Sequence, residues 1–254
     1  MFDDLKKKVV IITGGSGFFG SQLVEAYLKN DTKVINIDIK NGKTKHKNLF
    51  FYKCNIASEK NLKYCSNKIK KKFKIIDILI NNAAINHPPF KKKLGNNFEN
   101  LNLGLLQKEI GVGLVGAILC SKIFGTLMSQ QKNGGVIVNI SSDLGIIAPD
   151  QRLYSHNKFI KPVSYSVIKH GIIGLTKYTA AYWAKKKIRC NAFAPGGIDN
   201  NQNQTFKRKI KKLIPLARMA SKNEYNNTVL FLSSNKSSYI TGATIIADGG
   251  RSII

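Results

Sequence analysis

The stretch between residues 9 and 38 constrains the fold more than any other part of the sequence. It begins with Val9-Val10-Ile11-Ile12-Thr13, an apolar and mostly β-branched run that is typical of a strand buried on both faces of a parallel sheet. A glycine-rich turn follows at once, and a helical stripe of apolar residues starts inside it. Glycines permit a tight turn and let backbone N–H groups reach a pyrophosphate, which the N-terminus of a helix attracts. This stretch therefore predicts a dinucleotide-binding unit.

The strand that follows this helix ends in a carboxylate. Residues 34–38 form a short, largely apolar run that closes on Asp38, 18 residues after Gly20. Dinucleotide-binding folds hold the ribose hydroxyls of the adenosine with an acid at this place. Because Asp38 repels a 2′-phosphate, we expect NAD as the preferred cofactor, while the neighbouring Lys40 keeps NADP open.

Three further apolar runs end in small or polar residues. Residues 75–80 lead to Asn81-Asn82-Ala83-Ala84, residues 136–140 to Ser141-Ser142, and residues 188–194 to Pro195-Gly196. Active sites of open α/β sheets lie at the carboxyl ends of the strands, so we expect these residues to share one edge. The alternation of strand and helix patterns over 254 residues predicts a single α/β domain, residues 1–254, with a doubly wound parallel sheet in three layers.

The helical pattern near residue 165 carries a tyrosine and a lysine four residues apart, Tyr165 and Lys169. On a helix these side chains share one face, so both would look into the cleft beside Ser142. Lowering the pKa of a phenol from ~10 by about three units needs roughly 4 kcal/mol, which an ammonium at about 4 Å supplies at an effective dielectric of ~20. Tyr165 could then exchange a proton with an alcohol or a carbonyl while Ser142 holds the same oxygen. The spacing alone is weak, because Tyr154 and Lys158 repeat it.

The formal net charge of +27 suggests either a polyanionic partner or a solvated, lysine-rich surface. The lysines fall mostly where helix ends and loops are expected, without interleaved aromatic residues, so we favour the solvated surface and expect no nucleic-acid partner. The four cysteines lack a Cys-x-x-Cys spacing and sit in or beside apolar segments, which favours reduced thiols in the cytoplasm and no bound metal. We expect no secretory signal and no apolar span long enough to cross a membrane.

The chain resembles the short-chain dehydrogenase/reductase family over almost its whole length. The glycine turn, Asp38, the Asn-Asn-Ala-Ala and Ser-Ser segments, Tyr165 with Lys169, and the closing Asp248-Gly249-Gly250 stand in the order of that family. The resemblance implies a seven-stranded Rossmann sheet, a nicotinamide cofactor, and a homodimer or homotetramer with contacts through residues 164–185 and 252–254. It implies Ser142, Tyr165 and Lys169 as catalytic groups. The cofactor contacts that it implies are Gly14, Ser16, Gly17, Phe18, Phe19, Gly20, Asp38, Asn55, Ile56, Asn82, Ala83, Ala84, Tyr165, Lys169, Pro195, Gly196 and Ile198, where Lys169 binds the nicotinamide ribose.

The residues after each tyrosine decide which one matches the family. Lys169 is followed by the usual His-Gly-Ile-Ile-Gly continuation, whereas Pro162 would end any helix begun at Tyr154. Tyr165 lies 23 residues after Ser142, and Tyr154 lies 12 residues after it, which is the customary interval. We therefore expect an insertion at about 150–161 that forms part of the substrate wall. A polar lid is expected at about 197–213.

The sequence departs from the pattern of the family at several positions. The glycine turn has the Gly-x-x-Gly-x-x-Gly spacing of the extended branch, and Asn55 and Asn200 replace commoner residues. Gly113 stands where a helix asparagine is usual, which puts the usual proton relay from Lys169 in doubt. Because Ser142, Tyr165 and Lys169 are all present, we favour an active enzyme over a non-catalytic dinucleotide-sensing protein.

The residues around the expected pocket are polar and suit a sugar, a polyol or an anionic substrate better than a steroid or an acyl chain. Ordinary loop solvation explains such polarity equally well. The segments from Ser142 to Tyr154 and from Lys161 to His170 resemble sugar dehydrogenases of flagellin-modification and nonulosonate pathways, which implies a phosphorylated or nucleotide-linked sugar. A 3-oxoacyl-carrier-protein-type or polyol reductase is the alternative. The candidate substrate contacts are Asp143, Arg152, Tyr154 and His156, with Arg152 the best candidate for an anionic group.

Overall fold

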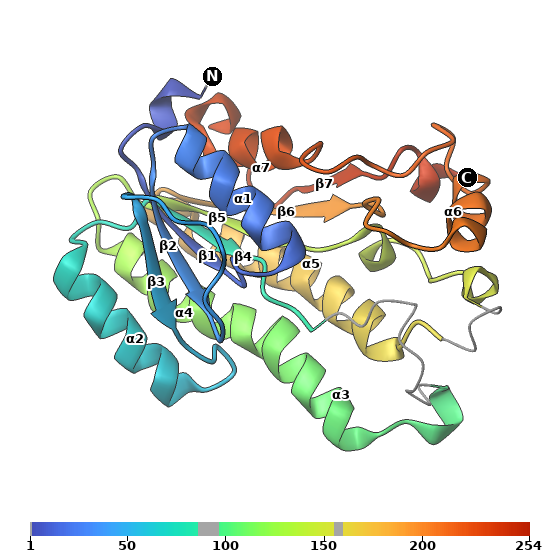
Figure 1. Cartoon of the computed structure of the whole chain (residues 1–254). Coiled ribbons are helices and arrows are strands. Elements are labelled where there is room, and N and C mark those ends of the chain that lie inside the picture. Colours follow the sequence, from blue (N-terminus) through green and yellow to red (C-terminus); the bar gives the residue numbers. More distant parts are fainter. Residues whose placement is uncertain (1, 86–96, 155–159) are drawn as a thin grey trace.

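Seven parallel strands form one sheet in the computed structural model, which describes residues 2–85, 97–154 and 160–254 (Figure 1). Their order is β3-β2-β1-β4-β5-β6-β7. The chain adds β2 and β3 on one side of β1 and β4 to β7 on the other side, so the order of strands reverses between β1 and β4. The prediction of a doubly wound parallel sheet is confirmed. The strands are β1 (Val9–Thr13), β2 (Lys33–Asp38), β3 (Leu49–Lys53), β4 (Ile78–Asn81), β5 (Gly135–Ile140), β6 (Ile188–Pro195) and β7 (Thr244–Ala247).

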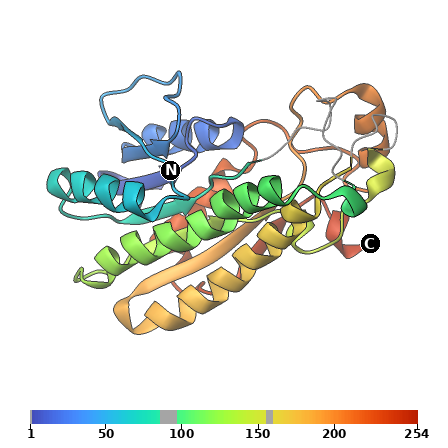
Figure 2. The ribbon, with the colours of Figure 1, turned by 90° about the horizontal axis from the view of Figure 1, so that it is seen from below.

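Helices cover both faces of the sheet. The helices α2, α4 and α5 pack on one face, and α1 and α7 on the other, which gives the three layers seen in Figures 1 and 2. Along the chain α3 continues into α4, and α6 lies near the C-terminus. The helices are α1 (Phe18–Lys29), α2 (Glu59–Lys72), α3 (Leu103–Ile110), α4 (Gly116–Ser129), α5 (Val163–Trp183), α6 (Gln204–Lys211) and α7 (Asn226–Ser233).

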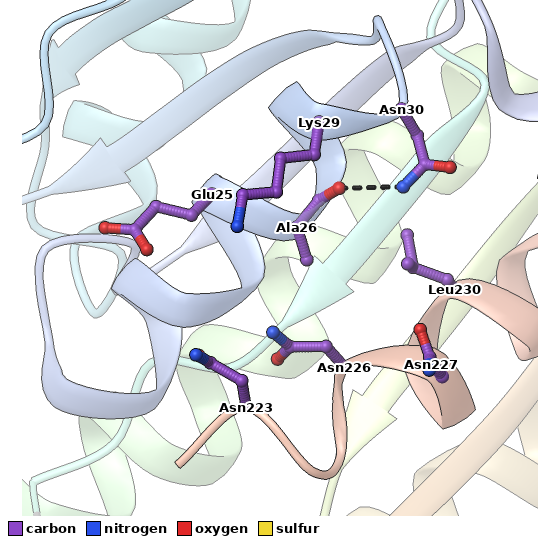
Figure 3. Close-up of a pocket in the computed structure, with 8 residues that line it drawn as sticks. All are labelled: Glu25, Ala26, Lys29, Asn30, Asn223, Asn226, Asn227 and Leu230. Atoms are coloured by element: carbon purple, nitrogen blue, oxygen red, sulfur yellow. Dashed lines mark hydrogen bonds between the residues drawn. The ribbon is translucent and has the colours of Figure 1, made fainter. Parts of the chain in front are cut away.

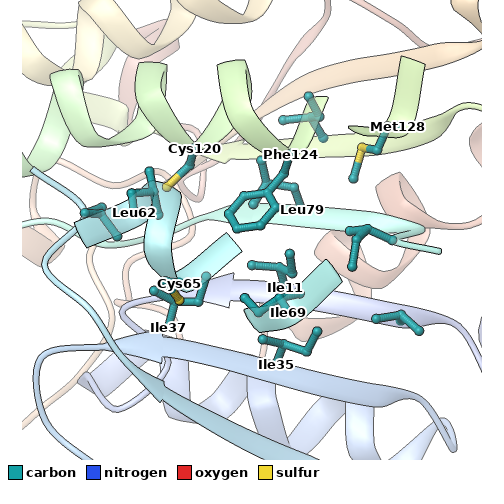
Figure 4. Close-up of a cluster of buried hydrophobic side chains, with 14 of the residues drawn as sticks. Ile11, Ile35, Ile37, Leu62, Cys65, Ile69, Leu79, Cys120, Phe124 and Met128 are labelled. Carbon is teal, nitrogen blue, oxygen red and sulfur yellow. The ribbon is translucent and has the colours of Figure 1, made fainter. Parts of the chain in front are cut away.

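The central strands are buried on both faces. In β1, Val9 and Ile11 belong to the apolar cluster under α2, α4 and α5, whereas Val10 and Ile12 belong to the cluster under α1 and α7. Figure 4 shows the first cluster, in which strand residues such as Ile11 meet Phe124 of α4. Alternate side chains therefore enter different cores, and this is why the strands read as continuous apolar runs.

Residues 103–129 form one continuous helical run with an irregularity in its middle. Gly111–Val115 is π-helical and joins α3 to α4. A Cβ at Gly113 would lie 2.9 Å from Ile168 of α5, and one at Gly116 would lie 2.8 Å from Ile56. Both glycines therefore permit close packing, because any side chain there would meet a neighbouring one.

One expectation about this run was wrong. Leu103–Ser129 is long and apolar enough to cross a membrane by length and composition, with a mean hydropathy of 1.9 over its most apolar window. Only 39% of that window is buried in the isolated chain. The error has a physical cause, since α4 packs on the sheet with one face and leaves apolar side chains such as Ile118 exposed on the other.

The four cysteines are buried free thiols, as their positions in apolar segments predicted. All four belong to the cluster of Figure 4, where Cys65 and Cys120 are labelled. Burial raises the pKa of the Cys120 thiol far above its ordinary value. These thiols therefore behave as small apolar side chains.

Two helix glycines give opposite predictions for the same substitution. A Cβ at Gly125 of α4 would lie 2.3 Å from the Trp183 ring, whereas a Cβ at Gly174 of α5 meets nothing within 4 Å. We expect Gly125→Ala to lower the free energy of unfolding by about 1–3 kcal/mol through overpacking. We expect Gly174→Ala to raise it by about 0.5–1 kcal/mol through helix propensity. Urea denaturation followed by circular dichroism measures both, and equal effects of the two variants would contradict the packing of Trp183.

Candidate active site

The glycine turn between β1 and α1 has the shape that a dinucleotide requires. Gly14 has a φ of +66°, and a Cβ there would lie 2.8 Å from the Ala83 Cα. A Cβ at Gly20 would lie 2.1 Å from the Gly14 carbonyl oxygen. Gly17 precedes the first turn of α1, where the backbone N–H groups of Phe18, Phe19 and Gly20 have no acceptor within the helix. This narrow cradle of N–H groups at a helix N-terminus fits a pyrophosphate.

Asp38 lies against this turn at the carboxyl end of β2. Its carboxylate accepts hydrogen bonds from the backbone N–H groups of Ser16, at 3.0 Å, and Lys40, at 3.2 Å. The Ser16 hydroxyl in turn donates to the Lys40 carbonyl and accepts from Asn36. Ser16 therefore holds the acid beside the turn, and the acid stands where the adenosine ribose of a dinucleotide is expected.

The segment after β4 braces the turn from the other side. The Asn82 side chain donates to the carbonyl oxygens of Thr13, at 3.0 Å, and Gly14, at 3.1 Å. The Thr13 hydroxyl accepts from the backbone N–H groups of Asn82 and Ala83. The Asn82 side chain thus supports the glycine turn, while Ala84 is exposed beside it.

Other expected cofactor contacts take different environments. Phe18 is exposed, and Phe19 packs edge-on against Tyr225, so of these two residues only the backbone N–H groups face a phosphate. Asn55 is exposed after β3, and Ile56 is buried in the core. Three half-buried residues, Pro195, Gly196 and Ile198, lie at and beyond the carboxyl end of β6.

Three side chains expected to be catalytic come together at the carboxyl end of β5. Lys169 is buried, and its ammonium donates to the Ile140 carbonyl at 2.8 Å and lies 5.7 Å from the centre of the Tyr165 ring. The Ser142 hydroxyl is within hydrogen-bonding reach of the Tyr165 phenol. Ser141, the alternative serine, instead donates its hydroxyl to the Lys169 carbonyl at 2.8 Å. Ser142 is therefore the serine that meets the phenol.

The electrostatics of the phenol differ from the expectation. Burial raises the pKa of Tyr165 to about 12, the charge of Asp143 adds to this rise, and the hydrogen bond with Ser142 opposes it. Burial also lowers the pKa of Lys169 to about 8, and the like charge of Lys161 lowers it further. In the protein alone, removal from water raises the pKa of Tyr165 more than the hydrogen bond with Ser142 lowers it, so the expected lowering of the Tyr165 pKa was wrong for this state.

The candidate substrate contacts lie in three different settings. Arg152 is on the surface, where its side chain is 88% exposed and pairs with Asp150 at 2.9 Å. Tyr154 is buried and packs on Phe206 of α6, with ring centres 5.6 Å apart. Asp143 is buried in a salt bridge with Arg251, and its role as a substrate contact stays a prediction. His156 lies outside the described residues.

Sequence reasoning missed two cations, one over the phenol and one paired with Asp143. The Lys161 ammonium lies 3.7 Å from the centre of the Tyr165 ring. Arg251, in the C-terminal turn, forms the salt bridge with Asp143. Lys161 directly precedes Pro162, the N-cap residue of α5. This position, just before the helix that carries Tyr165, could have identified Lys161 from the sequence. No local pattern points to Arg251.

The pocket of Figure 3 is a separate feature. It has a volume of about 240 Å³ and lies between the C-terminal half of α1 and the start of α7, with residues such as Asn30 and Asn226 on its wall. None of the residues that line it belongs to the expected site. A second pocket of about 290 Å³, lined by Gly197, Tyr225 and Asp248 among others, lies beyond the end of β6.

The glycine cradle, its acid, and the tyrosine and lysine on α5 define a dinucleotide-dependent oxidoreductase. A family model described as enoyl-(acyl carrier protein) reductase matches residues 19–252. The chain belongs to the short-chain dehydrogenase/reductase family and is an NAD(P)-dependent oxidoreductase.

Known relatives agree with this assignment. A short-chain dehydrogenase of Leptospira borgpetersenii with bound NAD+ is 34% identical, with a TM-score of 0.90 over 98% of this chain and 94% of that one. An aldohexose dehydrogenase of Thermoplasma acidophilum is 28% identical, with a TM-score of 0.86 over 100% and 97%. The post-translational flagellin modification protein A of Campylobacter coli is 28% identical over 97% and 98%. The chain spans 43% of an uncharacterised short-chain type dehydrogenase/reductase of Sinorhizobium fredii, at 28% identity over 96% of this chain.

The two tyrosines of the expected loop give a matched prediction. We expect Tyr165→Phe to reduce turnover about 100-fold or more, since proton transfer by a positioned group contributes that much. We expect Tyr154→Phe to retain most of the activity, because Tyr154 packs under α6. NADH formation by each variant with one common sugar substrate measures both, and a larger loss for Tyr154→Phe would reject the assignment of Tyr165.

Proposed function

We propose that this enzyme transfers a hydride between NAD and a secondary alcohol or ketone on a polar substrate, a sugar or sugar derivative that carries an anionic group. The proposal rests on one observation: Tyr165 lies near Ser142 and Lys169, and a second ammonium, from Lys161, lies over its ring. Tyr165 exchanges a proton with the substrate oxygen, Ser142 holds that oxygen, and Lys169 stabilises the phenolate. A bound nicotinamide dinucleotide supplies the hydride acceptor or donor and, when oxidised, a positive charge.

The preference for NAD rests on Asp38. Two backbone N–H groups hold its carboxylate in place, and a 2′-phosphate would meet this fixed negative charge. Lys40 donates its backbone N–H to Asp38, and its side chain is exposed, so it does not neutralise the acid at close range. The bound NAD+ of the Leptospira relative supports the same preference.

The anionic substrate rests on Lys161. Its ammonium lies over the proposed catalytic phenol, whereas Arg152 points to the surface and pairs with Asp150. Burial lowers the pKa of Lys161 to about 8, with Asp143 and Glu109 opposing the shift, so the ammonium form prevails at pH 7. The aldohexose dehydrogenase and the flagellin modification protein among the relatives support a sugar, and we place the reaction in bacterial surface-glycan or flagellin modification in the cytoplasm.

The substrate wall and the lid are proposed at residues 150–161 and 197–213. The Gln151 side chain pairs with both backbone groups of Lys161, and Tyr154 packs against α6. The Lys209 ammonium of α6 donates to the Arg152 carbonyl at 2.9 Å. These contacts join the two segments beside the catalytic helix and support their role as one wall of the substrate site.

We also propose a homodimer or homotetramer through the outer faces of α4 and α5. Five large apolar or aromatic side chains are exposed there, namely Val115, Ile118, Val167, Tyr178 and Tyr182. Tyr178 and Tyr182 stack on each other, with ring centres 5.7 Å apart. A second copy of the same surface would cover this face and complete the burial of the apolar run 103–129.

A carrier-bound acyl substrate is the second candidate, because the matching family model is described as an enoyl-(acyl carrier protein) reductase. A panel of aldohexoses, sugar phosphates, nucleotide sugars and an acetoacetyl thioester, followed by NADH absorbance, separates the two. Turnover restricted to the thioester would reject the sugar proposal.

Asp38 gives a prediction for cofactor choice. Asp38→Ala removes the negative charge that opposes a 2′-phosphate, so we expect the ratio of kcat/KM for NAD over NADP to fall about tenfold or more. Asp38→Asn retains the hydrogen-bond acceptor and serves as the matched control for the charge. An unchanged ratio in both variants would show that Asp38 does not choose the cofactor.

Lys161 and Arg152 give a prediction for the substrate. We expect Lys161→Met to lower kcat/KM for a sugar phosphate by about tenfold or more, because the variant loses a charge-assisted hydrogen bond to the phosphate. We expect Arg152→Met to change it less than about twofold, because an exposed ion pair contributes little. The uncharged parent sugar is the control substrate. Equal losses on both sugars would contradict an anion contact at Lys161.

A further inference from the structure

A buried ion pair joins the C-terminal turn to the loop that follows β5. The Arg251 guanidinium donates to the Asp143 carboxylate at 2.6 Å, across 108 residues of sequence. Both residues are buried, with exposed fractions of 7% and 3%. Taking two charges out of water costs several kcal/mol per ion unless the geometry and further hydrogen bonds compensate, so a pair like this needs a reason beyond stability.

The second oxygen of Asp143 points to that reason. It accepts a hydrogen bond from the Ser142 hydroxyl at 2.7 Å and one from the Leu144 backbone N–H at 2.9 Å. The Ser142 oxygen also accepts from the Leu144 backbone N–H at 3.2 Å, so Asp143 and Leu144 together fix the orientation of this hydroxyl, which lowers the pKa of the Tyr165 phenol. Arg251, Asp143 and Ser142 therefore form a chain of hydrogen bonds, and its last member influences the proposed proton donor Tyr165.

The C-terminal turn that carries Arg251 is itself held in place. The Asp248 carboxylate accepts from the backbone N–H groups of Gly250, at 2.9 Å, and Ser252, at 2.8 Å. Gly250 has a φ of +89°, a conformation that other residues rarely adopt. The Arg251 side chain therefore extends from a turn that hydrogen bonds hold in place.

We propose that Arg251 is a positioning residue for the reaction: through Asp143 it orients the Ser142 hydroxyl and neutralises the negative charge next to the Tyr165 phenol. The proposal rests on the proposed function, because it assumes that Tyr165 exchanges the proton.

The sign of the expected effect follows from the charges around the phenol. Asp143 opposes the phenolate, and Arg251 offsets Asp143, so removing the guanidinium raises the pKa of Tyr165. Removing the Asp143 charge lowers it. The titratable and charged groups that face Tyr165 or its partners from the packed elements are Glu109, Asp143, Tyr154, Lys161, Lys169 and Arg251.

The test is a titration of the Tyr165 phenol in the enzyme with NAD+ bound, by ultraviolet difference absorbance against the same variant carrying Tyr165→Phe. We expect Arg251→Met to raise the pKa of Tyr165 by about one unit, Arg251→Lys to restore most of it, and Arg251→Met with Asp143→Asn to return it to the wild-type range. An unchanged pKa in Arg251→Met, or a rise that persists in the double variant, would overturn the proposal.

Thermal unfolding and NADH binding of each variant separate positioning from folding. If Arg251→Met does not fold, Asp143→Asn decides alone: a lower Tyr165 pKa supports the proposal, and an unchanged one overturns it. The titration uses no substrate, so a failure of the sugar assignment leaves its result intact.

Discussion

The site depends on one buried ammonium. Lys169 lies inside the protein, and a buried charge is tolerated only when hydrogen bonds replace water. The Ile140 carbonyl, at the carboxyl end of β5, provides such a bond, and this ties α5 to the edge of the sheet. The loop after β5 must then pass close to α5, since a Cβ at Gly145 would lie 2.8 Å from the Lys169 carbonyl oxygen. This close passage brings Ser142 to Tyr165.

A row of buried amides extends the same constraint across the sheet. The Asn81 side chain donates to Asn139 at 2.8 Å and to Ser121 of α4 at 2.9 Å, and Asn139 donates to Thr176 of α5 at 2.9 Å. Two strands and two helices are thus joined by hydrogen bonds that would be costly to leave unmade. The elements that carry Ser142, Tyr165 and Lys169 are therefore held together by buried hydrogen bonds.

Much of the fold could be read from the sequence, because its cause is local. The β-branched runs and the glycine turn each act within a few residues, and Pro162 marks the start of α5 just before Tyr165. The pairing of Asp143 with Arg251 is different in kind, since it joins residues 108 positions apart and follows no period. The direction of the Tyr165 pKa also escaped prediction, because its largest cause is burial, which only the packed structure defines.

The chain has Gly113 where the family usually has a helix asparagine, and packing explains this difference. At its position Gly113 lies in a π-helical turn, and Ile168 of α5 fills the space that a side chain would need. Gly113 therefore reflects a change in the packing between two helices. Its partner Ile168 lies one turn of α5 from Tyr165 and directly before Lys169 in the sequence. Beside it the buried Glu109 accepts a hydrogen bond from Ser164, directly before the phenol. Since Ser142, Tyr165 and Lys169 meet despite the exchange, the glycine is better explained as the partner of Ile168 than as the mark of a lost active site.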